Sequence, residues 1–301
     1  MTTPTHHDDH DHEHDRGFTY DLPRLIGRRR ALQVLTGAGL LALVGCASSN
    51  SDGAATTAGS GTDGSSATTS GTSSASSTAA TSAAATSATT SGDVEIIPEE
   101  TAGPFPADGS NGPNVLTESG VVRSDIRSSF GSSSGTADGV RTTIAFTVVD
   151  AAGGSPLAGA AIYAWHCDRE GRYSIYSDGA QDQNYLRGVQ ETGGDGTATF
   201  TTIYPACYDG RWPHVHFEVY QSLADATSGG SPIATSQIAL PEDVSSAVYA
   251  TDGYEQSVSN LSRLSLESDM VFSDGAELET PTVTGSVDDG YAVALTVGVG
   301  G

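Results

Sequence analysis

The stretch 208–217, Tyr-Asp-Gly-Arg-Trp-Pro-His-Val-His-Phe, contains two histidines, a tyrosine and an arginine within ten residues. Successive side chains of a β-strand point to opposite faces, so we expect His214 and His216 on one face and Val215 on the other. Pro213 cannot donate a hydrogen bond to a neighbouring strand and is expected where the strand begins. The loop before it can then bring Tyr208 over the two imidazoles. This pattern predicts a metal site.

The distribution of histidine supports this prediction, because a His-x-His pair alone is a weak signal. The chain has eight histidines, of which five lie within residues 6–14. That acidic, histidine-rich opening has the composition of a metal-binding tract, but it precedes an export signal, and we assign it no function. Beyond it only His166, His214 and His216 remain.

Residues 1–45 are expected to be a signal peptide. Arg28, Arg29 and Arg30 precede the apolar run 31–44, which is too short to cross a bilayer and is typical of a signal h-region. The arginines resemble a twin-arginine signal, and Leu-Val-Gly-Cys at 43–46 resembles a bacterial lipobox. We therefore predict that Cys46 is lipidated and that the protein is exported and lipid-anchored to the outer face of the cytoplasmic membrane. An uncleaved anchor helix is the alternative.

Residues 46–93 are expected to form a disordered tether. Residues 47–92 contain no Pro, no aromatic residue and no Leu, Ile or Val. Such a segment cannot bury enough apolar surface to offset its ordering entropy. As a flexible coil it would span roughly 35–40 Å. The remaining segment, 94–301, is long enough for one domain with a sizeable core.

The pattern of this domain is mostly β. Short alternating segments bounded by Gly, Pro, Asp and Ser predict strands at 142–149, 160–165, 197–203, 214–220 and 233–240, and a closing hairpin at 282–287 and 291–299. One short helix is predicted at 241–249. Regularly spaced short strands indicate an all-β fold, either a sandwich or a barrel.

The charge balance argues against a nucleic-acid partner. Beyond residue 45 the chain carries 8 arginines, no lysine and 31 acidic residues. Such a surface repels phosphate backbones, and it also repels anionic substrates unless local arginines compensate.

Cys167 and Cys207 are the two cysteines of the predicted domain. Outside the cytoplasm they have one possible pairing, and a disulfide between them is our first expectation. Two buried thiols are the alternative. Thiolate ligation of a metal ranks third, because an exposed thiolate would oxidise outside the cell.

Three motifs together resemble the active-site sequence of the intradiol ring-cleavage dioxygenases. They are Trp-His-Cys-Asp-Arg-Glu-Gly-Arg-Tyr at 165–173, Ile-Tyr-Pro-Ala-Cys-Tyr at 203–208 and Arg-Trp-Pro-His-Val-His-Phe at 211–217. Segments 100–105 and 235–237 also resemble that family. The family comprises non-haem ferric enzymes that use O₂ to open catechols between the two hydroxylated carbons. The resemblance implies a β-sandwich of the prealbumin-like type with long loops, and the ferric ligands Tyr173, Tyr208, His214 and His216.

The ligand set suits the metal that the resemblance implies. Ferric iron is a hard cation that prefers anionic oxygen, and only a strong Lewis acid holds a tyrosine, whose ordinary pKa is about 10, as phenolate at neutral pH. Two phenolates and one hydroxide would balance its three charges, and two neutral imidazoles would complete five ligands. The alternative for Tyr173 and Tyr208 is that they are two of eleven tyrosines that pack the sandwich.

The resemblance also implies three catalytic roles. Tyr208 would leave the metal and take a substrate proton, Arg211 would stabilise negative charge that builds on the substrate, and Gln237 would orient Arg211 or the oxygen on the metal. A surface salt bridge is the alternative for Arg211, and a polar residue at a sheet edge is the alternative for Gln237. Only five residues separate Tyr208 from His214, fewer than in cytosolic relatives, so one pocket wall should be lower.

Two other functions compete with ring cleavage. A copper-zinc dismutase-like sandwich needs more histidine ligands than this domain supplies. A non-catalytic, transthyretin-like binding module on a cell-surface tether predicts a colourless protein. The partners expected for the enzyme are a small aromatic diol and O₂. The short spacing between Tyr208 and His214 and the lack of the helical dimerisation segment that catechol-type members carry leave the substituents of the diol and the oligomeric state open.

Overall fold

The computed structural model describes residues 92–300. The predicted signal peptide, Cys46 and nearly all of the predicted tether lie outside these residues. Within them, no helix has the length and apolar character needed to span a membrane.

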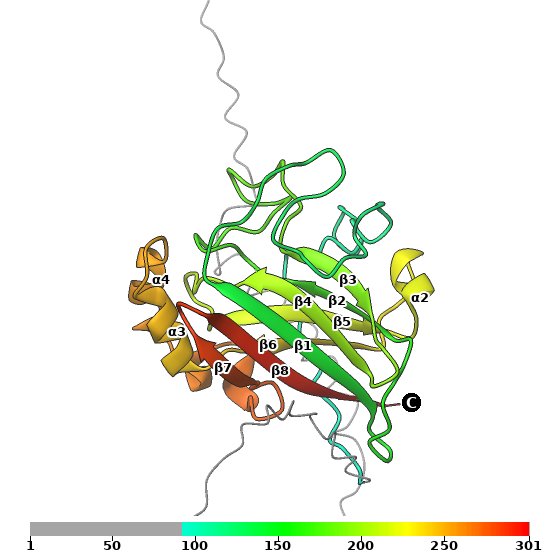
Figure 1. Cartoon of the computed structure of the whole chain (residues 1–301). Helices are drawn as coiled ribbons and strands as arrows, with labels where there is room; N and C mark the ends of the chain where they lie inside the picture. Colours follow the sequence, from blue (N-terminus) through cyan, green and yellow to red (C-terminus); the bar gives the residue numbers. More distant parts are fainter. Residues whose placement is uncertain (1–91, 301) are drawn as a thin grey trace, which may run out of the picture. The chain divides into compact units, whose positions relative to one another are not determined.

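The first of two four-stranded sheets has the order β4-β1-β8-β7. Its strands are β1 (Arg141–Asp150), β4 (Thr197–Ile203), β7 (Thr282–Ser286) and β8 (Gly290–Val299). β1 and β8 run parallel, and the other pairs are antiparallel. The two long strands form the middle of this sheet (Figure 1).

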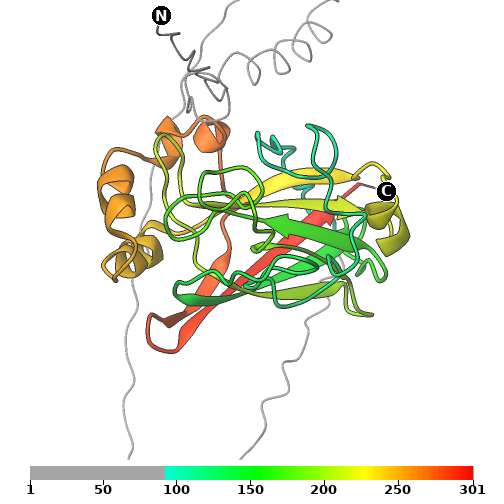
Figure 2. The same ribbon diagram turned by 90° about the horizontal axis from the view of Figure 1, so that it is seen from above.

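The second sheet has the order β3-β2-β5-β6 and is antiparallel throughout. Its strands are β2 (Ala161–Trp165), β3 (Arg187–Glu191), β5 (His214–Tyr220) and β6 (Ala234–Ala239). The predicted β-sandwich is therefore confirmed. Helices α3 (Glu242–Tyr249) and α4 (Glu255–Leu261) lie together at one end of the sheets, and α2 (Leu223–Thr227) lies at the other (Figures 1 and 2).

The core between the sheets follows from the alternation of apolar side chains. Phe146 of β1 packs against Phe217 of β5, with ring centroids 4.9 Å apart, and against Phe200 of β4 at 6.1 Å. Val215 belongs to the same buried cluster. Each such side chain contributes roughly 1.5–3 kcal/mol through burial.

The second sheet is also buried on its other face. Every residue of β2 and β5 is buried, whereas β1 alternates. A separate cluster on that face includes Tyr163 and Trp165 of β2 together with Tyr173, and partly buried Phe105 and Tyr208 pack against it. Because these last three come from loops, the second sheet is the floor of a site that loops cover.

The predicted strands all exist, with ends shifted by at most one residue, but the sequence interpretation missed three elements. These are β3, α2 and α4, together with short 3₁₀ turns at Leu266–Ser268 and Phe272–Asp274. β3 reads Arg-Gly-Val-Gln-Glu and lacks an apolar alternation, because its first residue is an arginine buried in the fold. The helices are only five and seven residues long, too short to show a helical period.

The expected disulfide is wrong for this structure, in which Cys167 and Cys207 are free, buried thiols. Cys167 packs in the cluster over the second sheet, and Cys207 packs in the inter-sheet core. Each thiol donates to the backbone carbonyl of another residue, Cys167 to that of Ala206 at 3.6 Å and Cys207 to that of Arg211 at 3.4 Å. Burial raises the pKa of both, that of Cys207 to about 12, so both thiols stay protonated at neutral pH.

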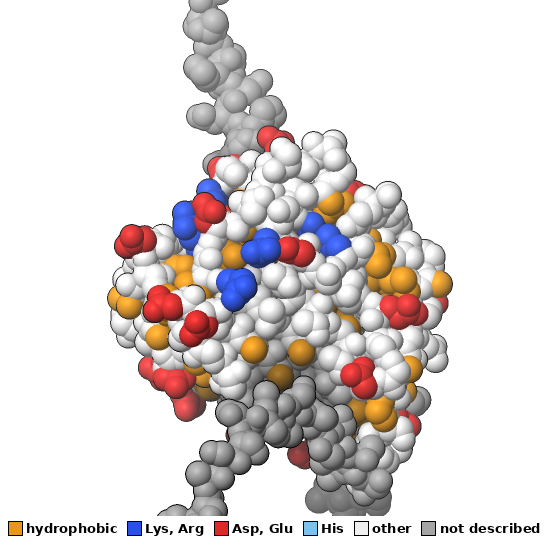
Figure 3. Space-filling model, in the orientation of Figure 1, with side chains coloured by type: hydrophobic (Ala, Val, Ile, Leu, Met, Phe, Trp, Pro, Cys, Tyr) orange, Lys and Arg blue, Asp and Glu red, His pale blue; other side chains and the backbone are white. Residues whose placement is uncertain are grey.

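One face of the surface carries arginines that are mostly paired with acids (Figure 3). Arg127 pairs with Asp125 at 2.7 Å, and Arg172 pairs with the buried Asp168 at 2.9 Å. Arg263 pairs with Asp209 at 2.9 Å. Each of these three cations therefore has an acidic partner.

Glu279 is expected to make stability depend on pH. It is fully buried, its Oε1 accepts from Ser236 at 3.3 Å, and its Oε2 has no hydrogen-bond partner within the described residues. Burial and then the charge of Glu100 raise the pKa of Glu279 from 4.5 to about 8. The folded protein therefore keeps a proton that the unfolded chain releases, and stability falls as the pH rises from about 4.5 to about 8.

Glu279→Gln removes this titration without changing the shape of the side chain. We expect the free energy of unfolding of the wild type to fall by roughly 2–4 kcal/mol across that pH range because of Glu279, and that of the variant to lack this fall. Urea denaturation at several pH values measures the difference between variant and wild type. Exposed Glu277→Gln is the control and should keep the wild-type slope. Equal slopes for Glu279→Gln and wild type would contradict the prediction.

Candidate active site

His214 and His216 lie on β5 and project from the face opposite to Val215, as predicted. His216 is paired in register with Trp165 of β2 and with Gln237 of β6. Both imidazoles are buried, and their ring centroids lie 4.8 Å apart at an interplanar angle of 86°. The strand thus presents two nitrogen donors side by side on the floor of the site.

Tyr173 and Tyr208 reach these imidazoles from two different loops. The hydroxyl of Tyr208 lies 3.1 Å from His214 Nε2, and the hydroxyl of Tyr173 lies 3.3 Å from the same atom. The two phenol rings are 5.9 Å apart, and the Tyr173 ring is 6.2 Å from that of His216. All four predicted ligands therefore converge at one buried position.

The imidazoles are held in defined orientations. Nδ1 of His214 donates to the carbonyl of Trp212 at 2.5 Å, which leaves the lone pair of Nε2 facing the phenols. His216 stacks on Trp165, with centroids 5.0 Å apart and an angle of 4°. Nδ1 of His216 is buried and has no hydrogen-bond partner of good geometry within the described residues, although the Thr101 backbone acts to raise its pKa.

Gly103 closes the site above His216. Its backbone has φ = +70°, and a Cβ there would lie 3.2 Å from Cε1 and 3.6 Å from Nε2 of that imidazole. Glycine is suited to this position because it adopts a positive φ and allows close approach. Phe105, two residues further on, packs its ring against that of Tyr173, with centroids 5.0 Å apart.

Burial keeps the centre neutral without a cation. It lowers the pKa of His214 and of His216 well below the ordinary range, with charges on Arg211 and neighbouring imidazoles acting in the same direction. Burial also raises the pKa of Tyr208 to about 12, although Arg211 acts against this, and raises that of Tyr173 well above its ordinary value. Only a strong Lewis acid would convert these phenols to phenolates at neutral pH.

The donor chemistry fits a hard, highly charged cation better than a soft one. Within residues 92–300 there is no group of three or more His, Cys, Asp and Glu side chains placed to hold a metal ion. The two neutral imidazoles are instead complemented by two phenol oxygens. Oxygen and imidazole donors of this kind suit ferric iron, so the residues present fit the cofactor that the sequence resemblance implies.

Arg211 and Gln237 lie beside this centre in one hydrogen-bonded chain. Arg211 donates to Gln237 Oε1 at 2.7 Å, and Gln237 Nε2 donates to the Thr101 carbonyl at 2.8 Å. Arg211 also pairs with Asp269 at 3.0 Å, and both side chains are buried, so the ion pair is not at the surface. Asp269 was not identified from the sequence, because it lies in a loop 58 residues after Arg211 and belongs to no recognisable motif.

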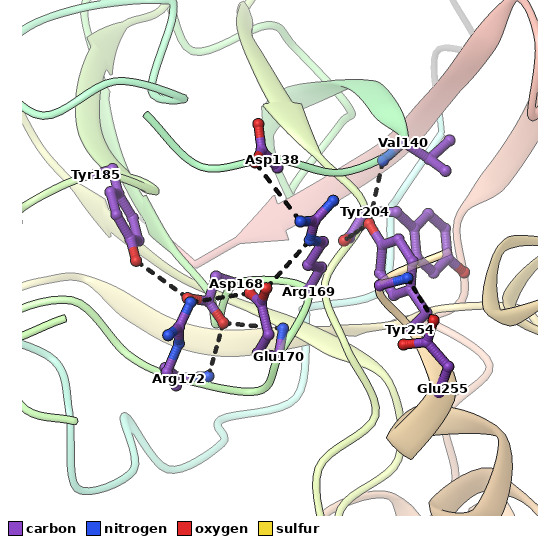
Figure 4. A network of polar contacts seen from close by, with 11 residues as sticks. Asp138, Val140, Asp168, Arg169, Glu170, Arg172, Tyr185, Tyr204, Tyr254 and Glu255 are labelled. Atoms are coloured by element: carbon purple, nitrogen blue, oxygen red, sulfur yellow. Dashed lines mark hydrogen bonds and ion pairs between the residues drawn. The ribbon is translucent and has the colours of Figure 1, made fainter. Parts of the chain in front are cut away.

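A second polar network fixes the loop that carries Tyr173 (Figure 4). Asp168 is its centre and accepts from Arg172 at 2.9 Å and from the hydroxyl of Tyr185 at 3.0 Å. Gly171, with φ = +84°, lets this loop pack closely on the other ligand loop, since a Cβ there would lie 3.2 Å from Cβ of Tyr208.

The part of the chain that contains this site is similar to known proteins. A family model described as "Dioxygenase" (Dioxygenase_C) matches residues 112–224, which include all four converging side chains and Arg211. The structure of an intradiol ring-cleavage dioxygenase from Tetranychus urticae is 25% identical, with a TM-score of 0.55, over 69% of this chain and 95% of that one. The part of the chain that holds the candidate site is therefore similar to a dioxygenase family model, and the fold is similar to that of an intradiol ring-cleavage dioxygenase.

Two curated proteins match over a shorter stretch. A catechol 1,2-dioxygenase from Acinetobacter lwoffii is 43% identical over 56 residues, which are 18% of this chain and 18% of that protein. A chlorocatechol 1,2-dioxygenase from Rhodococcus opacus is 39% identical over 56 residues, 19% of this chain and 22% of that protein. The match therefore spans about a fifth of the length of each of these relatives.

Proposed function

We propose that this chain is a ferric, non-haem dioxygenase that opens a small aromatic diol between its two hydroxylated carbons. Tyr173, Tyr208, His214 and His216 would hold the ion. The proposal rests chiefly on one observation: two phenol oxygens from separate loops lie within 3.3 Å of a single buried imidazole nitrogen. A sandwich that used these tyrosines only for packing would have no reason to gather four donor groups at one point.

The roles of the residues follow from their positions. Ferric iron, when bound, would supply the Lewis acidity that ionises phenols and the redox activity that lets the diol react with O₂. Tyr208 is partly exposed, unlike Tyr173, and is therefore the better placed of the two to take up a substrate proton. Arg211 keeps its charge because it pairs with Asp269, and it would stabilise negative charge that develops on the diol.

We also propose, on the sequence pattern alone, where the protein works. Residues 1–45 would direct export, Cys46 would carry the lipid, and residues 46–93 would tether the domain 94–301 to the outer face of the cytoplasmic membrane. Labelling with a radioactive or clickable fatty acid would test this assignment. The label should be lost in Cys46→Ser and retained in Cys207→Ser.

Ferric reconstitution and oxygen uptake test the enzymatic proposal. The iron-loaded protein should absorb visible light, consume one O₂ per catechol cleaved and place both atoms of ¹⁸O₂ in the ring-opened acid. Catechol, protocatechuate, hydroxyquinol and chlorinated catechols would compare substituents. A protein that stays colourless and inert after reconstitution would support the non-catalytic binding module instead.

A further inference from the structure

Arg187 is a buried cation whose hydrogen bonds all go to neutral oxygens. It begins β3 and is 0% exposed. Its guanidinium donates to Ser174 Oγ at 3.0 Å and to the Ser174 carbonyl at 3.0 Å. It also donates to the carbonyls of Phe105 at 2.8 Å and Pro106 at 3.1 Å, and to the hydroxyl of Tyr163 at 3.3 Å.

The absence of an acidic partner distinguishes this arginine from Arg211. The ion pairs formed within residues 92–300 do not include Arg187. A buried charge is costly unless hydrogen bonds replace its hydration, and here neutral backbone and hydroxyl oxygens do so. A planar fork with five donors can join several chain segments at once, which an apolar side chain of similar size cannot do.

The segments that Arg187 joins are those that build the candidate site. Ser174 directly follows Tyr173, so two of the hydrogen bonds fix the loop at the ligand itself. The Phe105 ring lies 5.0 Å from the Tyr173 ring, and its backbone is the other segment held. Tyr163 completes the set, because it donates to the Pro106 carbonyl at 2.7 Å and stacks on Trp165, which stacks on His216.

We propose that Arg187 is a positioning residue of the active site: its guanidinium fastens the Tyr173 loop and the Phe105 segment to the second sheet, and so sets where the Tyr173 oxygen meets the metal. This rests on the proposed function. β3 carries no predicted ligand, but its first residue would fix Tyr173, the predicted ligand that is most distant in the sequence from the other three.

Arg123 provides a matched control. Its guanidinium also donates to backbone carbonyls, to that of Arg187 at 2.6 Å and that of Asn184 at 3.1 Å. It lies over the Phe130 ring at 4.6 Å. Its contact with Arg187 is made to the backbone carbonyl and not to the guanidinium, and neither Asn184 nor Phe130 adjoins Tyr173 or Phe105. Its replacement should therefore remove comparable hydrogen bonds and leave the guanidinium of Arg187 with its own partners.

The test compares Arg187→Lys with Arg123→Lys. Lysine keeps the charge but loses the fork. We expect ferric affinity, measured by competition with a chelator, to fall about 10–100-fold in Arg187→Lys, as for other groups that orient metal ligands, and the phenolate-to-iron absorption band to shift. Arg123→Lys should retain the wild-type band and change affinity less than about 3-fold.

A readout without metal separates this inference from the proposed function. Backbone amides of Tyr176 and Ser177 donate to the Tyr173 carbonyl at 3.2 and 2.9 Å. Their hydrogen exchange in the metal-free protein should accelerate in Arg187→Lys and not in Arg123→Lys. If wild type takes up no ferric ion, the proposed function fails, and this exchange still decides whether Arg187 fixes the loop.

Two outcomes would overturn the inference. In the first, Arg187→Lys loses about as much stability as Arg123→Lys but keeps the wild-type absorption band and ferric affinity. The other is unaltered exchange at the Tyr173 loop. If Arg187→Lys does not fold, Ser174→Ala takes its place, because it removes one acceptor of the Arg187 guanidinium. It should shift the absorption band in the same direction by a smaller amount. An unshifted band would again contradict the inference.

Discussion

Tyr208→Phe is expected to lower kcat/KM of the iron-loaded protein toward catechol by about 10²–10⁴-fold, the range for loss of a general base. It should also shift or bleach the visible absorption, because one phenolate donor is lost. The phenylalanine ring keeps the packing of the loop, and only the hydroxyl 3.1 Å from His214 Nε2 disappears. The effect should therefore fall on chemistry and spectrum rather than on folding.

Stopped-flow oxygen consumption and absorption spectra of reconstituted proteins measure this effect. Tyr204→Phe is a suitable control, since Tyr204 is a buried tyrosine nearby in sequence whose hydroxyl bonds Ser245 at 2.7 Å and contacts no predicted ligand. It should keep the wild-type colour. A wild-type spectrum and rate in Tyr208→Phe would show that Tyr208 is neither a ligand nor a general base.

Asp269→Ala should destabilise the domain by about 3–5 kcal/mol, because it leaves the charge of Arg211 buried without its partner. Asp269 is wholly buried and accepts from Arg211 at 3.0 Å and from the Trp212 amide at 2.6 Å. Its second oxygen accepts from the amides of Val271 at 2.8 Å and Phe272 at 3.2 Å. One carboxylate thus holds together Arg211, the residue that follows it and a loop that is distant in the sequence.

Chemical denaturation measures this loss. Asp125→Ala is the comparison, because Asp125 also pairs with an arginine at 2.7 Å but is 51% exposed. Solvent screening should limit its effect to about 1 kcal/mol or less. Equal destabilisation by the two substitutions would show that burial of the Arg211 pair carries no special cost.

Local sequence patterns were sufficient where the physics is local. The strand carrying the histidines, 214–220, was predicted with its observed ends, because the alternation of side chains in a strand depends on neighbouring residues only. The same holds for Val215, which faces the core while the imidazoles face the loops. The resemblance of three short motifs then indicated which tyrosines to consider.

Local patterns did not predict structure where a side chain interacts with residues that are distant in the sequence. β3 was missed because its first residue is buried for its hydrogen bonds to two loops rather than for apolar packing. The prediction of a disulfide was wrong because the positions of two cysteines in the chain do not determine which hydrophobic cluster each one packs in.

Residue type and spacing in the chain are enough to name the available donor groups, which are two imidazoles on one strand face and two phenols preceded by Gly-Arg and Pro-Ala-Cys. The fold is needed to show that Tyr173, 41 residues from His214, comes within 3.3 Å of it, and that Asp269, 58 residues from Arg211, pairs with that arginine. Such contacts depend on the order of strands in the sheet and on how the loops fold over it. Neither can be read from the neighbours of a residue in the chain.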